Sequence, residues 1–219
     1  DWGNSYKSYS KENLRSLKKN HIKKLEEIKI LQYLFDCQWA DLRTYANKKG
    51  IRIIGDIPIY VAFNSTDVWA NQSLFKLSTI GEMRVQSGTP PDFFIDTGQT
   101  WGHPIYDWTE HKKDNYQWWT SRIAHLFERM DIIRIDHFNG FAKYWEVPAE
   151  DKNGTRGKWV DGPGKSLFNA IMARVGPKPI LAEDLGEASE DAAVLRNEYG
   201  IPGMKILQMS FGNGIPFES

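Results

Sequence analysis

The 219-residue sequence has one cysteine, no net charge and no long apolar run. A single cysteine excludes a framework of internal disulfides, and the apolar helical stretch around Cys37 predicts a buried thiol. Equal numbers of acidic and basic residues, 28 of each, argue against a nucleic-acid-binding surface. No segment approaches the roughly 18 apolar residues of a membrane span, and DWGNSYKSYS has no signal-peptide pattern. We expect neither nucleic acid nor a membrane as a partner.

The same features favour a cytoplasmic location. The sequence does not begin with Met, so we expect a processed chain or part of a longer one, and a plastid location stays open. With roughly 150 residues per domain, the length predicts one large domain or part of one, with a sizeable core. Aromatic residues are abundant, at 13%. Core packing is their usual role, and platforms for ring-shaped ligands are the second interpretation.

Apolar periodicity predicts alternating helices and strands. Apolar residues at three- and four-residue steps predict a helix over residues 11–49, which Gly50 ends. Helical patterns also occupy about 112–130, 164–175 and 189–199, and short apolar runs of strand type lie at 51–55, 131–135, 179–182 and 204–211. This alternation predicts an α/β fold built from parallel βαβ units.

Two insertions interrupt this order, at about residues 64–111 and 139–163. Both are rich in Gly, Pro, Trp and Asp without a clear period, which predicts long irregular loops. Glu146 and Asp151, in the second insertion, are expected to be solvated. Both insertions follow strands, so they emerge at the carboxyl edge of the sheet, where barrel and doubly wound α/β folds hold their active sites.

Three predicted strands end in an acid: Asp56, Asp136 and Glu183. One acid at a strand end is ordinary, but three on neighbouring parallel strands would gather at one edge. Two facing carboxylates can perform glycosidic bond chemistry, one attacking the sugar while the other protonates the leaving oxygen. In a retaining enzyme the two lie about 5–5.5 Å apart. Arg134, two residues before Asp136, points to the same side and could keep that carboxylate ionised.

Five segments resemble the 4-α-glucanotransferase family, also called amylomaltases, disproportionating enzymes or glycoside hydrolase family 77. They are GIRIIGDIPIYVAFNSTDVWAN, GTPPDFFIDTGQTWGHPIYDW, RIDHFNGFAKYWEVPA, ILAEDLG and GIPGMKILQMSFG, and the resemblance runs from about residue 30 to the C-terminus. It implies a (β/α)8 barrel that moves α-1,4-glucan segments between maltooligosaccharide or starch- and glycogen-derived chains, with retention and without a cofactor or metal. It also implies that Asp136 is the nucleophile, Glu183 the acid/base, and Arg134 the nucleophile's neighbour.

The resemblance further implies that Asp56, Gln99, Trp101 and His137 contact the sugar. Two positions depart from the family pattern: the family commonly has Asn in place of His103, and an acid or His in place of Asn64. His137 also raises a metal site with Glu183 and Asp184 as an alternative, but no HExxH pattern or second suitably spaced His supports it.

The family's third catalytic carboxylate, in a His-Asp-Asn segment on the seventh strand, has no counterpart in the sequence. We therefore expect residues 1–219 to be the central part of the catalytic domain, a partial (β/α)8 barrel of roughly strands three to six, inactive alone. The oligomeric state is not predicted. Two rival functions remain, a retaining α-glucan hydrolase of the same clan and a non-catalytic glucan-binding protein. Joint presence of Asp136 and Glu183 favours an enzyme, and the long family-specific loops favour transfer.

Overall fold

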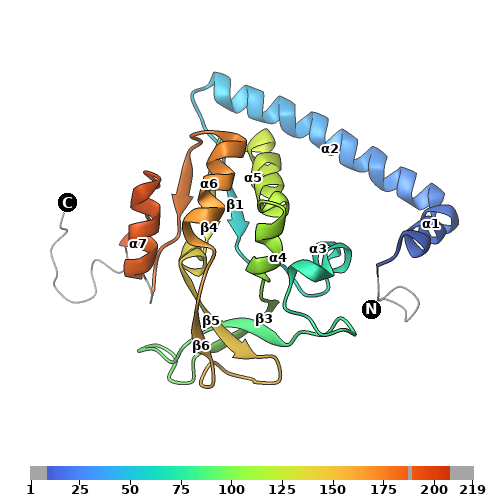
Figure 1. The fold of residues 1–219 in the computed structure, drawn as a ribbon. Helices are drawn as coiled ribbons and strands as arrows, with labels where there is room; N and C mark the ends of the chain where they lie inside the picture. The colour runs from blue at the N-terminus through green and yellow to red at the C-terminus, as the bar shows by residue number, and fades with distance from the viewer. Residues whose placement is uncertain (1–8, 187–188, 208–219) are drawn as a thin grey trace.

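The computed structural model describes residues 9–186 and 189–207. Its centre is a parallel sheet of three strands in the order β1 (Ile54–Pro58), β4 (Ile132–Asp136) and β7 (Ile180–Ala182) (Figure 1). The strands predicted at 131–135 and 179–182 are confirmed to within one residue. The fourth predicted strand is wrong over Met204–Leu207, which form no strand, and its remainder lies outside the described residues.

Strand β1 begins three residues later than the apolar run 51–55 predicts. The reason lies in the partners of the preceding backbone groups. The N–H of Ile51 donates to the carbonyl of Ala46 in the helix before it, and the N–H of Ile53 donates to the Asp131 carboxylate. Neither group is therefore free to join the ladder with β4.

The helices follow their predicted patterns with two breaks. The predicted helix 11–49 is two helices, α1 (Lys11–Asn20), which Ser10 caps, and α2 (Ile22–Lys48), with His21 between them in a non-helical conformation. The pattern at 112–130 is split into α4 (Trp108–Lys113) and α5 (Gln117–Arg129), because Asn115 and Tyr116 adopt left-handed φ angles of 56° and 59°. Helices α6 (Gly164–Val175) and α7 (Ser189–Glu198) match their predicted ranges.

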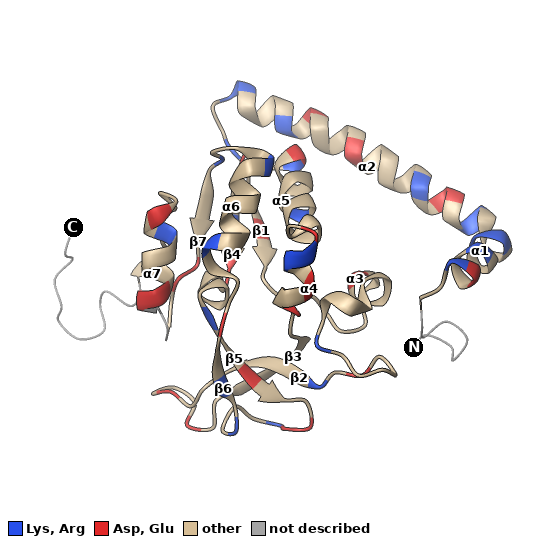
Figure 2. Cartoon of the chain, viewed as in Figure 1, with Lys and Arg blue, Asp and Glu red and all other residues tan. Residues whose placement is uncertain are grey.

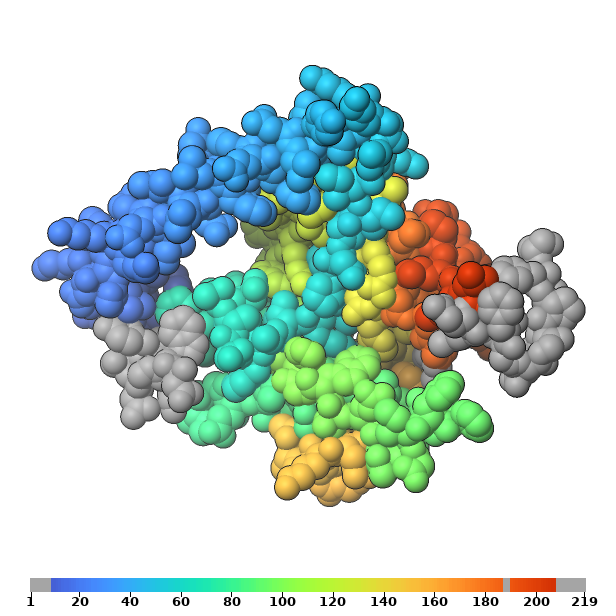
Figure 3. Space-filling model, turned by 180° about the vertical axis from the view of Figure 1, so that it is seen from behind, coloured from blue at the N-terminus to red at the C-terminus, as the bar shows by residue number. Residues whose placement is uncertain are grey.

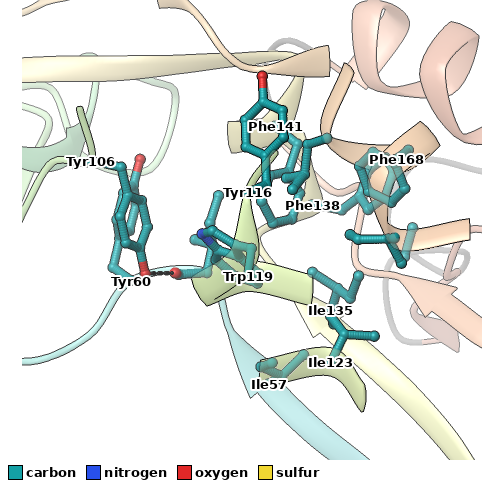
Figure 4. Close-up of a cluster of buried hydrophobic side chains, with 14 of the residues drawn as sticks. Ile57, Tyr60, Tyr106, Tyr116, Trp119, Ile123, Ile135, Phe138, Phe141 and Phe168 are labelled. Carbon is teal, nitrogen blue, oxygen red and sulfur yellow. Dashed lines mark hydrogen bonds between the residues drawn. The ribbon is translucent and has the colours of Figure 1, made fainter. Parts of the chain in front are cut away.

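The parallel sheet is buried on one face only. Helices α5 and α6 cover that face, where alternate residues of the strands point into the core: Ile57, Ile133, Ile135, Ile180 and Ala182. Rings of Tyr106, Trp119, Phe138, Phe141 and Phe168 fill the space beyond them (Figure 4). Trp119 is fully buried and Trp118 packs beside it, so both of these tryptophans serve core packing. The opposite face carries Asp56, Arg134 and Asp136.

The two insertions form a second sheet, so the prediction of irregular loops is wrong. Its strands are antiparallel in the order β3 (Gln99–Pro104), β2 (Val85–Thr89), β5 (Lys143–Pro148) and β6 (Lys158–Asp161). Short helices connect it to the first sheet: α3 (Thr66–Ala70), η2 (Gln72–Leu74) and η3 (Phe138–Phe141). Gly88 is needed in β2, because a Cβ there would lie 2.1 Å from the carbonyl oxygen of Gln99. The second sheet lies at the carboxyl edge of the first (Figure 1).

Two acids expected to be solvated are not. The Glu146 side chain is 7% exposed and pairs with the Lys76 ammonium at 2.5 Å, and Asp151, 8% exposed, pairs with Arg156. Glu146 is in β5 and Asp151 is in the loop that follows it, and in both cases a cationic partner compensates the burial of the carboxylate. A local sequence window does not contain the Lys76 partner of Glu146, which explains the wrong prediction.

Helix α2 projects from the body as a long arm (Figures 1 and 3). Its C-terminal half is fastened by Trp39, whose indole N–H donates to the carbonyl of Arg129 at 3.0 Å, and by Arg43, which pairs with Asp131 at 2.7 Å. None of its residues is buried, and its apolar stripe is exposed at Ile28, Leu31, Leu34, Phe35, Leu42 and Tyr45. Cys37 is exposed with it, so the prediction of a buried thiol is wrong. Figure 2 shows acidic and basic residues interspersed along the arm.

Candidate active site

Three charged side chains meet on the open face of the parallel sheet. Asp56 of β1 lies opposite Arg134 of β4 in the strand register, and Asp136 ends the same strand. Nη1 of Arg134 donates to both carboxylate oxygens of Asp56, at 2.8 and 2.9 Å, and Nη2 donates to Asp136 at 2.8 Å. The guanidinium therefore bridges two carboxylates, on the side of β4 that strand alternation predicts.

The bridge also determines the charge of the site. Burial of Arg134 disfavours its charged form, but its hydrogen bonds and charge interactions with Asp56 and Asp136 outweigh this, so the pKa of the guanidinium is raised above its usual value. Arg134 is 26% exposed, whereas Asp136 is 45% exposed. The carboxylate thus stays open to a ligand while the cation that holds it is largely covered.

Glu183 follows β7 and reaches the same edge of the sheet. One carboxylate oxygen accepts the backbone N–H of His137 at 2.8 Å, and the other accepts the N–H of Leu185 at 3.3 Å. Asn139 steadies this turn by donating from its side-chain amide to the carbonyl of Leu185. Because His137 is the residue after Asp136, these hydrogen bonds hold the Glu183 carboxylate beside the end of β4.

His137 is placed by an unusual backbone conformation. Its φ is 52°, a left-handed value that turns the chain from β4 into η3. Its ring meets the indole of Trp101 edge-on, with centroids 4.9 Å apart, and lies 6.2 Å from the ring of Tyr60. Burial lowers the pKa of His137 to about 4, with nearby Asp136 opposing the shift, so the imidazole is neutral at pH 7.

Trp101 and Gln99 come from β3 and complete one wall of the site. The indole N–H of Trp101 donates to the side-chain carbonyl of Gln99 at 3.2 Å, which fixes the orientation of the ring. His103 lies further along β3 and its ring is stacked with Tyr60 at 6.3 Å. Burial lowers the pKa of His103. The sequence-predicted residues Asp56, Gln99, Trp101, Arg134, Asp136, His137 and Glu183 thus all lie where the second sheet meets the carboxyl edge of the first.

A cavity of about 600 Å³ adjoins these residues. Asp136, His137, Trp101 and His103 line it, together with residues that sequence reasoning missed: Tyr60, Ser65, Asp67 and Arg122. The sequence contains a signal for Tyr60 as a site residue, because it lies two residues beyond the end of β1. It contains no such signal for Arg122, which comes from α5, where its guanidinium lies 4.9 Å from the Trp119 ring centroid. Over the residues that the structure describes, no cluster of three His, Cys, Asp or Glu side chains could hold a metal ion.

No helix among the described residues is long and apolar enough to cross a membrane.

Comparison with known proteins gives consistent matches. The model of the family described as 4-alpha-glucanotransferase, glycoside hydrolase family 77, matches residues 1–219. A 4-alpha-glucanotransferase from Clostridium butyricum is 46% identical over 213 residues, which are 96% of this chain and 44% of the relative. A chloroplastic/amyloplastic 4-alpha-glucanotransferase from Solanum tuberosum is 47% identical over 208 residues, which are 90% of this chain and 36% of the relative.

Solved structures agree with the sequence comparison. An amylomaltase from Streptococcus agalactiae, solved in complex with acarbose, superposes with a TM-score of 0.91 at 40% identity. The match covers 98% of this chain and 44% of that one. An amylomaltase from Corynebacterium glutamicum has the same fold, with a TM-score of 0.69 at 22% identity. The chain thus spans less than half the length of the Clostridium and potato relatives that it matches.

Proposed function

Because the chain belongs to the 4-alpha-glucanotransferase family, glycoside hydrolase family 77, we propose that the protein containing it transfers α-1,4-glucan segments between maltooligosaccharide or starch- and glycogen-derived chains. The observation that supports this most is the Arg134 bridge to Asp136, with the Glu183 carboxylate held beside it through the N–H of His137. A fixed, half-exposed carboxylate next to a second carboxylate is the equipment of retaining glycosidic chemistry, with an expected separation of about 5–5.5 Å.

In the first step, Asp136 attacks the anomeric carbon. A bond forms between its carboxylate oxygen and that carbon, the glycosidic C–O bond breaks, and Glu183 gives its proton to the leaving oxygen. The transition state carries positive charge on the sugar ring. Two carboxylates on one guanidinium leave Asp56, Arg134 and Asp136 with one net negative charge, which favours this transition state.

In the second step, Glu183 takes a proton from the 4-hydroxyl of an acceptor sugar. The acceptor oxygen bonds to the anomeric carbon, and the bond to Asp136 breaks, so that stereochemistry is retained and the enzyme is restored. No redox change occurs and no cofactor is required. The same glycosyl-enzyme would yield hydrolysis if water attacked in place of the acceptor, and a retaining α-glucan hydrolase is therefore the alternative.

Side chains near Asp136 supply sugar contacts in this proposal. The indole of Trp101 offers a flat apolar surface to a sugar ring, and Gln99 fixes its plane. Neutral His137 can donate or accept a hydrogen bond without adding positive charge beside a cationic transition state. Asp56 has free lone pairs, being 62% exposed, although both of its oxygens accept from Arg134. These contacts would bind an acceptor sugar at the site.

We also propose that residues 1–219 are the central part of a (β/α)8 barrel, about strands three to six. A parallel sheet with helices on one face and a charged opposite face fits a barrel wall whose inner side holds the active site. The extent of the match, 98% of this chain against 44% of the acarbose-bound amylomaltase, supports a fragment of that architecture. The location of the protein would then depend on its host: cytoplasmic in a bacterium, or plastidic in a plant. The chloroplastic/amyloplastic name of the potato relative supports the plastidic case.

The test is to incubate the full-length protein with maltotriose and resolve the products by chain length. Transfer yields glucose together with a ladder of longer oligosaccharides. Products shorter than the substrate, without longer ones, would mean hydrolysis, and unchanged maltotriose would favour a binding protein. Asp136→Asn is the matched control, because it keeps the size of the side chain but removes the nucleophilic charge. It should show neither transfer nor hydrolysis.

A further inference from the structure

The third nitrogen of the Arg134 fork has a partner that the proposed reaction does not use. While Nη1 and Nη2 donate to Asp56 and Asp136, Nε donates to the thioether sulfur of Met204 at 3.3 Å. Met204 lies 70 residues further along the chain, in the segment that follows α7. Each nitrogen of the guanidinium is therefore directed to a different residue.

The position of Met204 is itself fixed by a buried acid. Its backbone N–H donates to one carboxylate oxygen of Asp184 at 3.0 Å, and the other oxygen pairs with Nε of Arg196 in α7 at 2.7 Å. Asp184 is 11% exposed, so this pair is shielded from solvent. Just before Met204, the carbonyl of Pro202 accepts the N–H of Ala182 at the end of β7. The segment is held from both sides.

Gly203 allows this approach. A Cβ at position 203 would lie 2.4 Å from one carboxylate oxygen of Asp184 and 2.7 Å from the other, closer than real Cβ contacts permit. Any side chain at this position would push the segment away from Asp184, and with it the sulfur of Met204 from Arg134. The close passage of the backbone over the carboxylate explains the glycine.

We propose that Met204 is a positioning residue of the transfer reaction, a role that rests on the proposed function above. A guanidinium pairs readily with one carboxylate through two of its nitrogens. If Nε were free, Arg134 could turn to form such a fork with Asp56 or Asp136 and release the other. Sulfur at Nε removes this option. Because the thioether is neutral, it fixes the plane of the guanidinium without competing for its positive charge.

The experiment compares three variants of the full-length protein. Met204→Leu keeps the volume but removes the acceptor, and we expect kcat on maltotriose to fall about tenfold with KM changed less than about twofold, because misorientation affects the transition state most. Met204→Gln restores an acceptor oxygen and should recover most of kcat. Gly203→Ala, which displaces the segment, should behave as Met204→Leu does. Met172→Leu is the matched control, a partly buried methionine of α6, and should be unchanged.

The order of the variants separates positioning from packing. If Met204 served packing alone, the apolar Leu variant would keep its kcat and the polar Gln variant would lose activity. A kcat of Met204→Leu equal to or above that of Met204→Gln would therefore overturn the inference.

A second measurement does not depend on activity. Hydrogen exchange of the Arg134 Nε–H, followed by NMR with ¹⁵N-arginine and assigned with Arg134→Lys, should be several-fold faster in Met204→Leu and close to wild type in Met204→Gln. Wild-type protein without transferase activity would refute the proposed function, and this exchange would still decide whether Met204 fixes the guanidinium of Arg134. Unchanged exchange in Met204→Leu would overturn the inference whatever the activity.

Discussion

At the scale of single residues, the site depends on a side chain that can address several partners at once. Arg134 directs separate nitrogens to Asp56, Asp136 and Met204, which a lysine ammonium could not do with a fixed geometry. The two acids have different surroundings. Asp136 is held by a charged partner, whereas Glu183 is held by two backbone N–H groups. Asp136 thus has a cation as its partner, whereas Glu183 has only neutral backbone donors.

This difference predicts distinct mutant behaviour. Asp136→Asn should reduce transfer to background on every donor, because no nucleophile remains. Glu183→Gln should lower kcat/KM on maltotriose by about 10²- to 10⁴-fold, the usual contribution of a general acid. With a donor carrying an acidic phenol as leaving group, the first step needs no proton, so the Glu183→Gln burst of phenol should fall less than about tenfold. Stopped-flow absorbance of the released phenol measures it.

Glu128→Gln is the control, because it removes the charge of an exposed carboxylate on α5. Its kcat/KM should match that of wild type. Equal responses of Asp136→Asn and Glu183→Gln to leaving-group acidity would mean that the roles of nucleophile and acid are wrongly assigned.

Strand-end acids could be predicted from the sequence, because strand alternation alone puts Arg134 and Asp136 on one face. Other residues could not, because their environment is made by distant partners. Glu146 is buried against Lys76, and Arg122 enters the cavity from a helix whose own pattern indicates only core packing. Met204 was expected inside a strand, and its contact with Arg134 depends on Asp184.

At the scale of elements, what could be predicted was the parallel sheet. Its strands β1, β4 and β7 are short and rich in isoleucine, a composition typical of strands with a buried face. The antiparallel sheet has no such signature. In β2, three consecutive residues are buried, and one of them, Gln86, donates from its amide nitrogen to carbonyls of Pro148, Ala149 and Asp151. The side-chain partners of Gln86 lie more than 60 residues away, and local periodicity does not reveal them.

Helix α4 contributes a pH-dependent stability term through His111. This side chain is fully buried among Tyr106, Trp108 and Trp118. Burial lowers its pKa to about 4, against the opposing effect of Asp114. Between this value and the unfolded pKa of about 6.5, the unfolded state binds the proton and the folded state does not. The stabilisation is complete above pH 6.5 and is lost as the pH falls towards 4.

We therefore expect His111 to account for about 2 kcal/mol of the fall in unfolding free energy between pH 7 and pH 5. The measurement is urea unfolding at both pH values. In His111→Phe the pH dependence should be smaller by that amount, because Phe keeps an aromatic ring but cannot bind a proton. A fall as steep in His111→Phe as in wild type would contradict the assignment.

At the scale of the whole molecule, residues 1–219 expose surfaces that folded proteins normally cover. The apolar stripe of α2 is exposed along much of the arm. Within the described residues, β1 and β7 each pair with only one strand of the parallel sheet, β4. The charged face that holds Asp136 is open as well. Unpaired strand edges and exposed apolar faces favour association with further chain.

From this exposure we predict that a protein of residues 1–219 alone has no appreciable transferase activity. The three parallel strands that the structure describes cannot by themselves close an eight-stranded barrel. The third carboxylate that the family resemblance implies is also absent from residues 1–219, which should cost rate more than ground-state binding. Weak affinity for maltooligosaccharides through Trp101 should survive, and calorimetric titration against Trp101→Ala measures it. The exposed α2 stripe should bind a hydrophobic dye that the full-length protein does not bind. Robust disproportionation of maltotriose by a verified 219-residue monomer would contradict the prediction, since the catalytic set would then be complete within Asp136, Glu183 and their neighbours.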